Sequence, residues 1–388
     1  MNSFLPPSVD GLPIDKLSAV FNPRFTTTSY KFFWFLGILD EVKKWGQSEY
    51  SKNLQYTPLK IKISDILFNM VLNAWYPLYF NLNLGCQDQL CTIKKNLIEK
   101  ITNNKKAPLI EIDSDLFLTE INKIDNSEIE NETKDLNKYV PYRFLSPWYT
   151  DQRNKQVREK TQKEPELMFI YTFVDDKTLQ IEPSWLKYLT ENLKIVRDFT
   201  YWNLCFYLQR RNPHDHFIIN KINRVKERKS LKKIKNIWDS ALANGYEFEC
   251  PYSSSNNKII IGNYDLDHFI PWRYVCNNLM WNLTPAKKEA NRSKGDKLPD
   301  IDMCLKTFAL NQRTLLQYLV SVYGEKLEAF EKGQKKCPYI IYDYLSLGTT
   351  ITEIANKNDE DLVEFYKERI TPLYLQAKSI GFKPWDNK

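Results

Sequence analysis

The sequence predicts an α+β protein that is mainly α-helical and contains one small mixed segment. The chain has 388 residues, of which 43% are hydrophobic and 14% aromatic, so it can bury a large core in two or three domains. Apolar residues recur at spacings of three and four over long stretches, which is typical of helices. Residues 264–299 instead predict a strand, a loop, a second strand and a short helix.

Residues 1–140 are predicted to form an N-terminal helical region. Two buried helices are expected, at 30–45 with Ser29 as cap and at 63–76 with Ser64 and Asp65 as caps and Pro77 as the end. From 111 to 135 acidic residues strongly outnumber lysines, so this stretch is expected to be a solvated connection and a boundary.

Residues 141–245 are predicted to form a mixed region that ends in a basic helix. Its expected elements are an exposed loop at 150–166, a strand at 168–174, one helix at 184–212 between Ser184 and Pro213, and the basic helix, which ends at Gly245. Between Arg210 and Asp239, ten Lys and Arg face three acidic residues, a net +7 that equals the excess of the whole chain. Such a run is either a solvated helix face or a surface that contacts phosphates.

Residue types in short supply exclude several classes of protein. No two of the 11 glycines lie closer than Gly37 and Gly46, which excludes the glycine-rich phosphate loops of dinucleotide-binding and P-loop proteins. A three-histidine zinc site would need all 3 histidines, and His214 and His216 are expected in an exposed loop. The 7 cysteines form no Cys-x-x-Cys pair, which favours a reducing compartment. The sequence shows neither a signal-peptide pattern nor an apolar run long enough to span a membrane, so a cytoplasmic protein is expected.

The candidate catalytic and metal-binding residues lie in one segment, YDLDHFIPWRYVCNNLMWNLTPAKKEANRSKGDKLP, residues 264–299. Asp265 and Asp267 alternate along a strand that ends at His268, so both carboxylates are expected on one face. Pro271 directs the chain into a loop, after which residues 280–284 read as the second strand. Pro285 is expected to open the helix, which carries Asn291.

The order Asp-x-Asp-His, Asn, then Asn-Arg-x-Lys-x-Asp resembles the HNH endonucleases, also called ββα-metal or His-Me finger nucleases. Among them it looks most like the HNH domain of RNA-guided CRISPR effector nucleases. A RuvC-like half and a guide-binding lobe are not recognised, so an RNA-guided enzyme is not implied. The resemblance implies an embedded ββα-metal nuclease fold at 246–300. Residues 301–388 are predicted from their own sequence to form a C-terminal helical region.

The residue types fit hydrolysis of a phosphodiester. His268 can accept a proton from the attacking water at cellular pH. Asp267 and Asn291 offer hard oxygen ligands for one Mg²⁺ or Mn²⁺ per active site. Structural zinc is not expected, because Cys250 has no partner at the spacing that many HNH proteins use for zinc knuckles.

The resemblance and the charge pattern imply further roles. Asn282 is expected to pin the loop and orient His268, with Asp265 as a supporting carboxylate behind the metal ligands. The products are expected to carry a 5′-phosphate and a 3′-hydroxyl. Contacts with nucleic acid are expected from lysines and arginines of the motif and of the basic stretch, namely Lys287, Lys288, Arg292, Lys294, Arg224, Lys226, Lys229 and Lys233.

DNA is the predicted substrate, with RNA less favoured and no membrane partner expected. A role in bacterial restriction or anti-phage defence is expected from family association, and the chain could act as a homodimer or with a partner subunit. Two alternatives stay open: an RNase or structure-specific nickase, and a nucleic-acid-binding protein with a vestigial HNH fold. Retention of the base and both ligands speaks against the second alternative.

Overall fold

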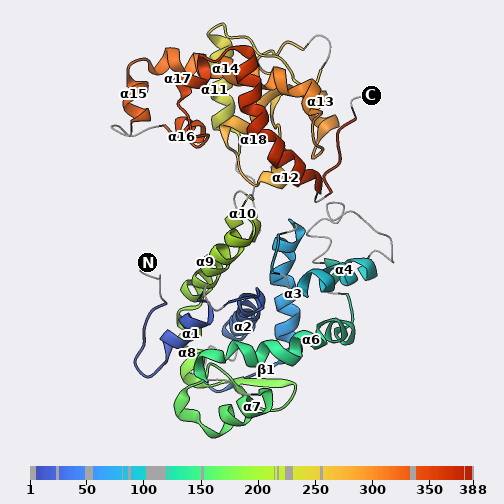
Figure 1. The fold of residues 1–388 in the computed structure, drawn as a ribbon, viewed down its shortest axis with the longest axis vertical. Helices are drawn as coiled ribbons and strands as arrows, with labels where there is room; N and C mark the ends of the chain where they lie inside the picture. Colours follow the sequence, from blue (N-terminus) through green and yellow to red (C-terminus); the bar gives the residue numbers. More distant parts are fainter. Residues whose placement is uncertain are drawn as a thin grey trace. The chain divides into compact units, whose positions relative to one another are not determined.

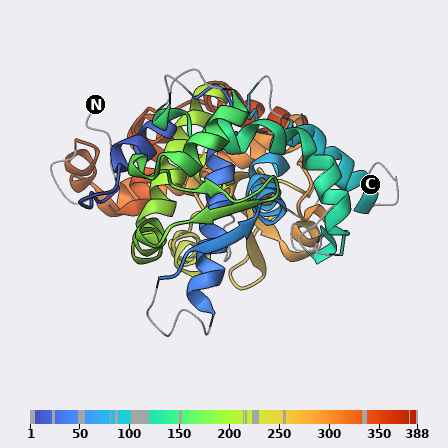
Figure 2. The ribbon, with the colours of Figure 1, turned by 90° about the horizontal axis from the view of Figure 1, so that it is seen from below.

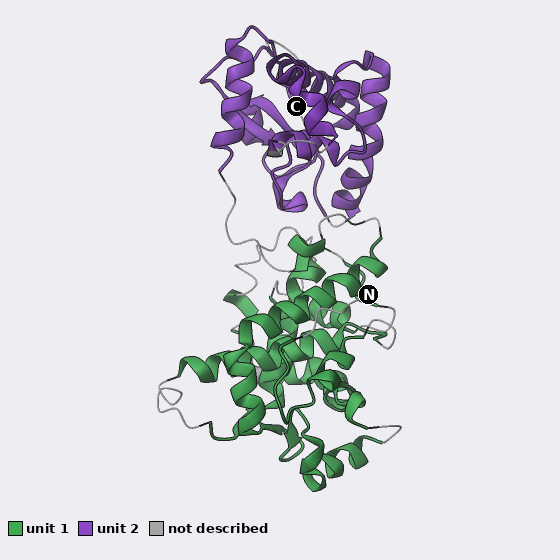
Figure 3. Ribbon diagram, turned by 90° about the vertical axis from the view of Figure 1, so that its left-hand side faces the viewer, with its two compact units in different colours: residues 1–224 green, residues 225–388 purple. Residues whose placement is uncertain are grey.

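The computed structural model describes most of the chain. The described residues are 6–22, 26–48, 56–80, 82–85, 89–101, 119–121, 123–149, 153–213, 215, 218–222, 230–253, 257–332, 338–379 and 381–386. Contacts divide the chain into two compact units, residues 1–224 and 225–388 (Figure 3). Within the described ranges, no helix is both long enough and apolar enough to span a membrane.

Two long helices, α2 (Tyr30–Gln47) and α3 (Ile63–Tyr79), form the centre of unit 1 and pack side by side (Figure 1). Every residue of α2 from Phe32 to Leu39 is buried. Gly37 permits the close approach, because a Cβ at this position would lie 2.6 Å from the carbonyl oxygen of Ile66. The expected pair of buried helices in the first third of the chain is therefore confirmed.

The remaining elements of unit 1 surround this pair. Its other helices are α1 (Ile14–Val20), α4 (Leu90–Ile101), α6 (Asn126–Phe144), η3 (Ser146–Trp148), α7 (Asn154–Lys163), η4 (Pro165–Leu167), α8 (Pro183–Glu191), α9 (Leu193–Arg211) and α10 (Ile218–Ile222). A small antiparallel sheet has the order β1 (Leu59–Lys62), β3 (Thr178–Ile181), β2 (Thr172–Phe173) (Figure 2). In its register Leu59 pairs with Ile181, and Phe173 pairs with Leu179.

Several expected boundaries in unit 1 are wrong. The helix α3 begins at Ile63 after Lys62 and continues through Pro77, because a proline in the last turn removes only one intrahelical bond. The expected loop at 150–166 contains helix α7. Only one narrow face of this helix is buried, through Val157 and Thr161. The acidic stretch at 111–135 is expected to be a connection, but helix α6 begins within it at Asn126. Residues 111–118 lie outside the described part.

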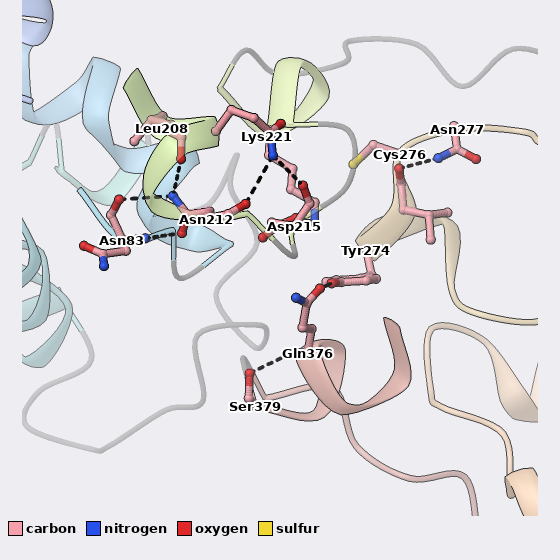
Figure 4. A network of polar contacts seen from close by, with 12 residues as sticks. Asn83, Leu208, Asn212, Asp215, Lys221, Tyr274, Cys276, Asn277, Gln376 and Ser379 are labelled. Carbon is pink, nitrogen blue, oxygen red and sulfur yellow. Dashed lines mark hydrogen bonds and ion pairs between the residues drawn. The ribbon is translucent and has the colours of Figure 1, made fainter. Parts of the chain in front are cut away.

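The helix expected at 184–212 is two helices, α8 and α9. Asn192 separates them with non-helical backbone angles of φ −108° and ψ 17°, ending the first helix and preceding the second. The cap of α8 is Glu182, so Ser184 lies inside the first turn rather than before it. At the far end, α9 stops at Arg211, before Pro213, and Asn212 donates from Nδ2 to the carbonyl groups of Leu208 and Asn83 (Figure 4).

Unit 2 packs helices around a β-hairpin. The hairpin consists of β4 (Tyr264–His268) and β5 (Leu283–Lys287). Its helices are α11 (Lys232–Ala243), α12 (Trp272–Val275), η5 (Met280–Asn282), α13 (Lys288–Lys294), α14 (Ile301–Tyr323), α15 (Lys326–Glu331), α16 (Tyr339–Leu345), α17 (Ile351–Ala355) and α18 (Asp359–Ser379). The predicted helical character of residues 301–388 is confirmed.

The long helix α14 supports the hairpin from the side of the core. Phe308 stacks on Phe269, just after β4, with ring centroids 4.2 Å apart. Asn311 donates to Thr284 Oγ1 at 3.1 Å, and Gln312 donates to the carbonyl of Leu283. On another element, Tyr274 of α12 donates to Gln376 Oε1 of α18 at 2.7 Å (Figure 4). The hairpin and its connecting loop are therefore held by the C-terminal helices.

Candidate active site

The hairpin and α13 bring the motif residues together in the predicted order of strand, loop, strand and helix. The two strands pair antiparallel, with Asp267 opposite Thr284 and His268 opposite Leu283. Two details differ from the prediction. Residues 280–282 form a 3₁₀ turn before the strand, and Pro285 lies inside β5 opposite Leu266 instead of opening the helix. A two-stranded hairpin tolerates this proline because each strand is an edge strand.

His268 ends β4 with its ring buried and oriented by the loop that follows. Its Nε2 lies 3.1 Å from the carbonyl oxygen of Asn277 and 3.0 Å from Oδ1 of Asn278. A carbonyl oxygen can only accept a hydrogen bond, so in the neutral ring Nε2 carries the proton. Nδ1 is then the basic nitrogen, which is the atom that a general base needs.

The loop between the strands is pinned by two asparagine side chains. Asn282 accepts from the backbone N–H of Ile270 and donates to its carbonyl, both at 2.9 Å. Asn277 donates to the carbonyl of Val275 at 2.8 Å and accepts from the N–H of Leu279 at 3.2 Å. Asn282 therefore pins the loop as predicted. Nε2 of His268, however, bonds to Asn277 and Asn278 rather than to Asn282.

Asp267 is held through one of its two carboxylate oxygens. Oδ2 accepts from the hydroxyl of Tyr252 at 2.7 Å and lies 2.8 Å from Nζ of Lys294. Burial raises the pKa of Tyr252 well above its usual value, and the adjacent carboxylate adds to the shift, so the phenol stays a donor. Among the described residues, Oδ1 of Asp267 has no hydrogen-bond partner.

Lys294 is predicted to contact phosphate, but in the structure it is buried against β4. Its side chain is 0% exposed, and its Nζ also donates to the carbonyl of His268 at 3.0 Å. The ammonium therefore joins α13 to the end of β4. Since side chains three positions apart share one face of a helix, Asn291 lies one turn before Lys294 on the face that meets β4.

The donor set fits a hard divalent cation. No group of three or more His, Cys, Asp and Glu side chains suited to a metal occurs in the described part of the chain. The candidate ligands are accordingly one carboxylate oxygen, Oδ1 of Asp267, and the carboxamide oxygen of Asn291, which is half-buried. Few protein ligands leave room for water and phosphate, the arrangement that Mg²⁺ favours at phosphate sites.

The other predicted residues lie around this centre. Asp265 shares the strand face of Asp267 and is half-exposed. Lys288 donates from Nζ to the carbonyl of Gly262 at 3.1 Å, Lys287 is half-buried, and Arg292 is exposed on α13. Lys233 is exposed on α11. Arg224, Lys226, Lys229, His214 and His216 lie outside the described residues.

Two kinds of contributing residue escaped the sequence-based reading. Tyr252 precedes the motif, and nothing in its sequence neighbourhood marks it as a partner of Asp267. Asn277 and Asn278 do carry a signal: they form an Asn pair inside the loop that follows the histidine, where side-chain amides commonly order backbone. Such a pair could have been proposed as the support of the His268 ring.

An antiparallel hairpin that is followed by a helix, with Asp-His at the end of the first strand, defines a ββα nuclease-type site. Residues 250–300 match the family model of the HNH endonucleases. No curated protein and no solved structure matches the chain. The match covers the motif and its scaffold, and it indicates a nuclease.

Proposed function

We propose that the protein is a metal-dependent endonuclease that hydrolyses DNA to 5′-phosphate and 3′-hydroxyl ends. The observation that carries this proposal is the orientation of His268. Its Nε2 is committed to the carbonyl of Asn277, which makes Nδ1 the proton acceptor. The DNA substrate, and a role in restriction or anti-phage defence, rest on the family resemblance.

In the proposed reaction, Nδ1 of His268 takes the proton of the attacking water. The imidazolium that results keeps its bond to the Asn277 carbonyl, which becomes stronger once the ring is charged. Because His268 is only 1% exposed, we propose that substrate binding opens the site locally. A general base of this type contributes about 10²- to 10⁴-fold to the rate.

Oδ1 of Asp267 and the amide oxygen of Asn291 would hold the cation. When bound, a divalent ion neutralises the charge that develops on the phosphate and the leaving oxygen. Tyr252 and Lys294 hold Oδ2 of the same carboxylate and thereby aim Oδ1. The two oxygens of Asp267 thus have separate roles. This supports the proposal, because Tyr252 and Lys294 contact Oδ2 and do not compete with a cation for Oδ1.

Nucleic acid would approach over the exposed basic residues of unit 2. Arg292 lies on the helix that carries Asn291, and Lys233 lies on α11. In turn, α11 is anchored near the strand, since Lys235 donates to the carbonyl of Tyr264 at 3.0 Å and lies 4.1 Å from its ring centroid. Exposed cations on α13 and α11 support phosphate contacts of the electrostatic, sequence-independent kind.

The test compares the purified protein with the variant His268→Ala on supercoiled plasmid and on RNA. Each substrate is incubated with Mg²⁺, Mn²⁺ or EDTA. We expect metal-dependent cleavage of the plasmid and loss of at least 10²-fold of the rate in the variant. His216→Ala is the matched control and should cleave normally. A circular dichroism spectrum and a melting curve verify that the buried substitution leaves the fold intact.

The outcomes separate the alternatives. Cleavage that survives both EDTA and the substitution overturns the mechanism. Cleavage of RNA alone overturns DNA as the substrate and favours the RNase alternative. Conversion of plasmid to nicked circles only would identify a nickase. A folded protein that binds DNA and cleaves neither substrate under any condition identifies a vestigial site.

A further inference from the structure

Unit 1 contains a cavity that the nuclease chemistry does not use. It has a volume of about 530 Å³, within the range of about 300–1,000 Å³ that is typical of small-molecule sites. The cavity is bordered by the first turn of α2, by one face of α6 and by residues just after α6. Apolar lining from Leu136 and aromatic lining from Tyr139 and Tyr149 accompany a set of polar groups.

Two cations line this cavity without a carboxylate partner. Lys31 is half-buried and donates from Nζ to Oγ of Ser146 at 3.0 Å, which uses one of its three donors. Arg143 lies with Cζ 5.2 Å from the ring centroid of Tyr139. Neither side chain forms an ion pair with any described residue. Among the described residues of the lining, Asp135 is the only acidic one, and it is exposed.

The two positive charges disfavour each other. Burial and the charge of Arg143 lower the pKa of Lys31 to about 8. An anion bound beside both groups would remove this repulsion and would receive charge-assisted hydrogen bonds from Lys31, from the guanidinium and from Ser146. Phosphate fits better than a single carboxylate, because it offers three oxygens to the donors that line the cavity.

We propose that this cavity binds a mononucleotide, with its phosphate beside Lys31 and Arg143 and its base against the tyrosine rings. The aromatic lining gives a base a planar partner, while Asp135 offers an acceptor at the side for an amino or hydroxyl group. The same chemistry is present in a free nucleotide and in the phosphorylated end of a nucleic-acid strand. The proposal is independent of the nuclease site, which lies in unit 2.

Isothermal titration of the full-length protein tests the proposal. The ligands are AMP, GMP, CMP and UMP, with adenosine and inorganic phosphate as comparisons and a 5′-phosphorylated tetranucleotide as a second source. The titrations are made with EDTA present, so that cleavage does not contribute. We expect at least one mononucleotide to bind at least 10-fold more tightly than adenosine and inorganic phosphate. Its affinity should fall between pH 7 and pH 9, as Lys31 loses its proton.

Variants assign the binding to the cavity. Lys31→Met and Arg143→Gln should each weaken the binding at least 10-fold, and Arg143 is exposed, so its substitution leaves the fold intact. Lys187→Gln, an exposed lysine of α8 in the same unit, is the matched control and should bind normally. Tighter binding of the tetranucleotide would assign the site to a strand end. Absence of nucleotide binding at millimolar concentration, equal binding of adenosine, or affinity unchanged in both variants overturns the proposal.

Discussion

The Nζ atom of Lys294 lies 2.8 Å from Oδ2 of Asp267, and the lysine side chain is entirely shielded from solvent. Because Nζ also donates to the carbonyl of His268, one ammonium ties the helix α13 to the last two residues of β4. A buried pair of this kind is costly to break, since the remaining charge loses its compensation. The contact therefore joins the helix that carries Asn291 to the strand that carries the Asp-His pair, and makes Lys294 part of the scaffold.

Replacing Lys294 by Met should destabilise the protein by about 3 kcal/mol, because Asp267 is then left with Tyr252 as its charge-stabilising partner. A divalent cation should restore part of this loss, since ligand binding to the folded state stabilises it. Thermal melting with and without Mg²⁺ measures both effects. A variant that melts at the wild-type temperature in EDTA would show that the pair contributes nothing.

Tyr252→Phe should cost about 1–2 kcal/mol of stability and raise the Mg²⁺ concentration needed for half-maximal cleavage, because a hydrogen bond to a charged group is lost. Urea unfolding and a metal titration of plasmid cleavage are the measurements. Tyr246→Phe is the matched control, since its hydroxyl bonds to the exposed Ser321. If both variants respond equally to the metal, Tyr252 does not aim Asp267.

Asn282→Ala should destabilise unit 2 by about 2–4 kcal/mol, because the buried N–H and carbonyl of Ile270 both lose their partner. Hydrogen–deuterium exchange should speed up in the loop that follows His268 and little elsewhere. Asn257→Ala removes an exposed amide contact with Glu249 and serves as the control. Unchanged exchange in this loop would contradict a pinning role.

Asp343 is predicted to make stability depend on pH. Burial raises the pKa of this carboxyl to about 6, against 3.8 in the unfolded chain, so the folded state binds the proton more tightly. Stability from this group is therefore present at low pH and lost as the pH rises from about 4 through about 6.

Asp343→Asn keeps an acceptor for the N–H of Met280 and cannot ionise. After allowance for partial exposure, we expect it to stabilise the protein by about 1 kcal/mol at pH 7.5 and hardly at all at pH 4. Urea unfolding at four pH values between these limits measures the difference. The exposed Asp302→Asn is the control. A gain of equal size at every pH would disprove ionisation as its cause.

The double variant Arg292→Gln, Lys233→Gln should weaken DNA binding and lower the slope of log affinity against log salt by about 2, one unit for each phosphate contact. Fluorescence anisotropy of a labelled duplex in EDTA, over a series of salt concentrations, gives the slope. Lys187→Gln in unit 1 should leave it unchanged. An unaltered slope in the double variant would mean that both cations are merely solvated.

The helical class, the hairpin with its helix and the position of the Asp-His pair could be predicted because local patterns specify them. Alternation over residues 264–268 and the Asn-rich loop act over a few residues, where steric and hydrogen-bonding preferences are decisive. The break at Asn192 and the helix α7 were missed because no hydrophobic pattern marks them. Helix α7 buries only Val157 and Thr161, too few positions to produce a visible apolar periodicity. No apolar pattern marks the break at Asn192 either.

The sequence by itself determined which residue types could perform hydrolysis. A chain with 3 histidines and dispersed glycines cannot bind phosphate with a glycine-rich loop or a histidine cluster, which leaves a metal ion and basic side chains. Only the tertiary structure decided how they are used. The burial of Lys294 and the contribution of Tyr252 depend on contacts between separate segments. Whether a lysine meets phosphate or a carboxylate is set by the desolvation of its side chain, a property of the folded chain that local sequence does not contain.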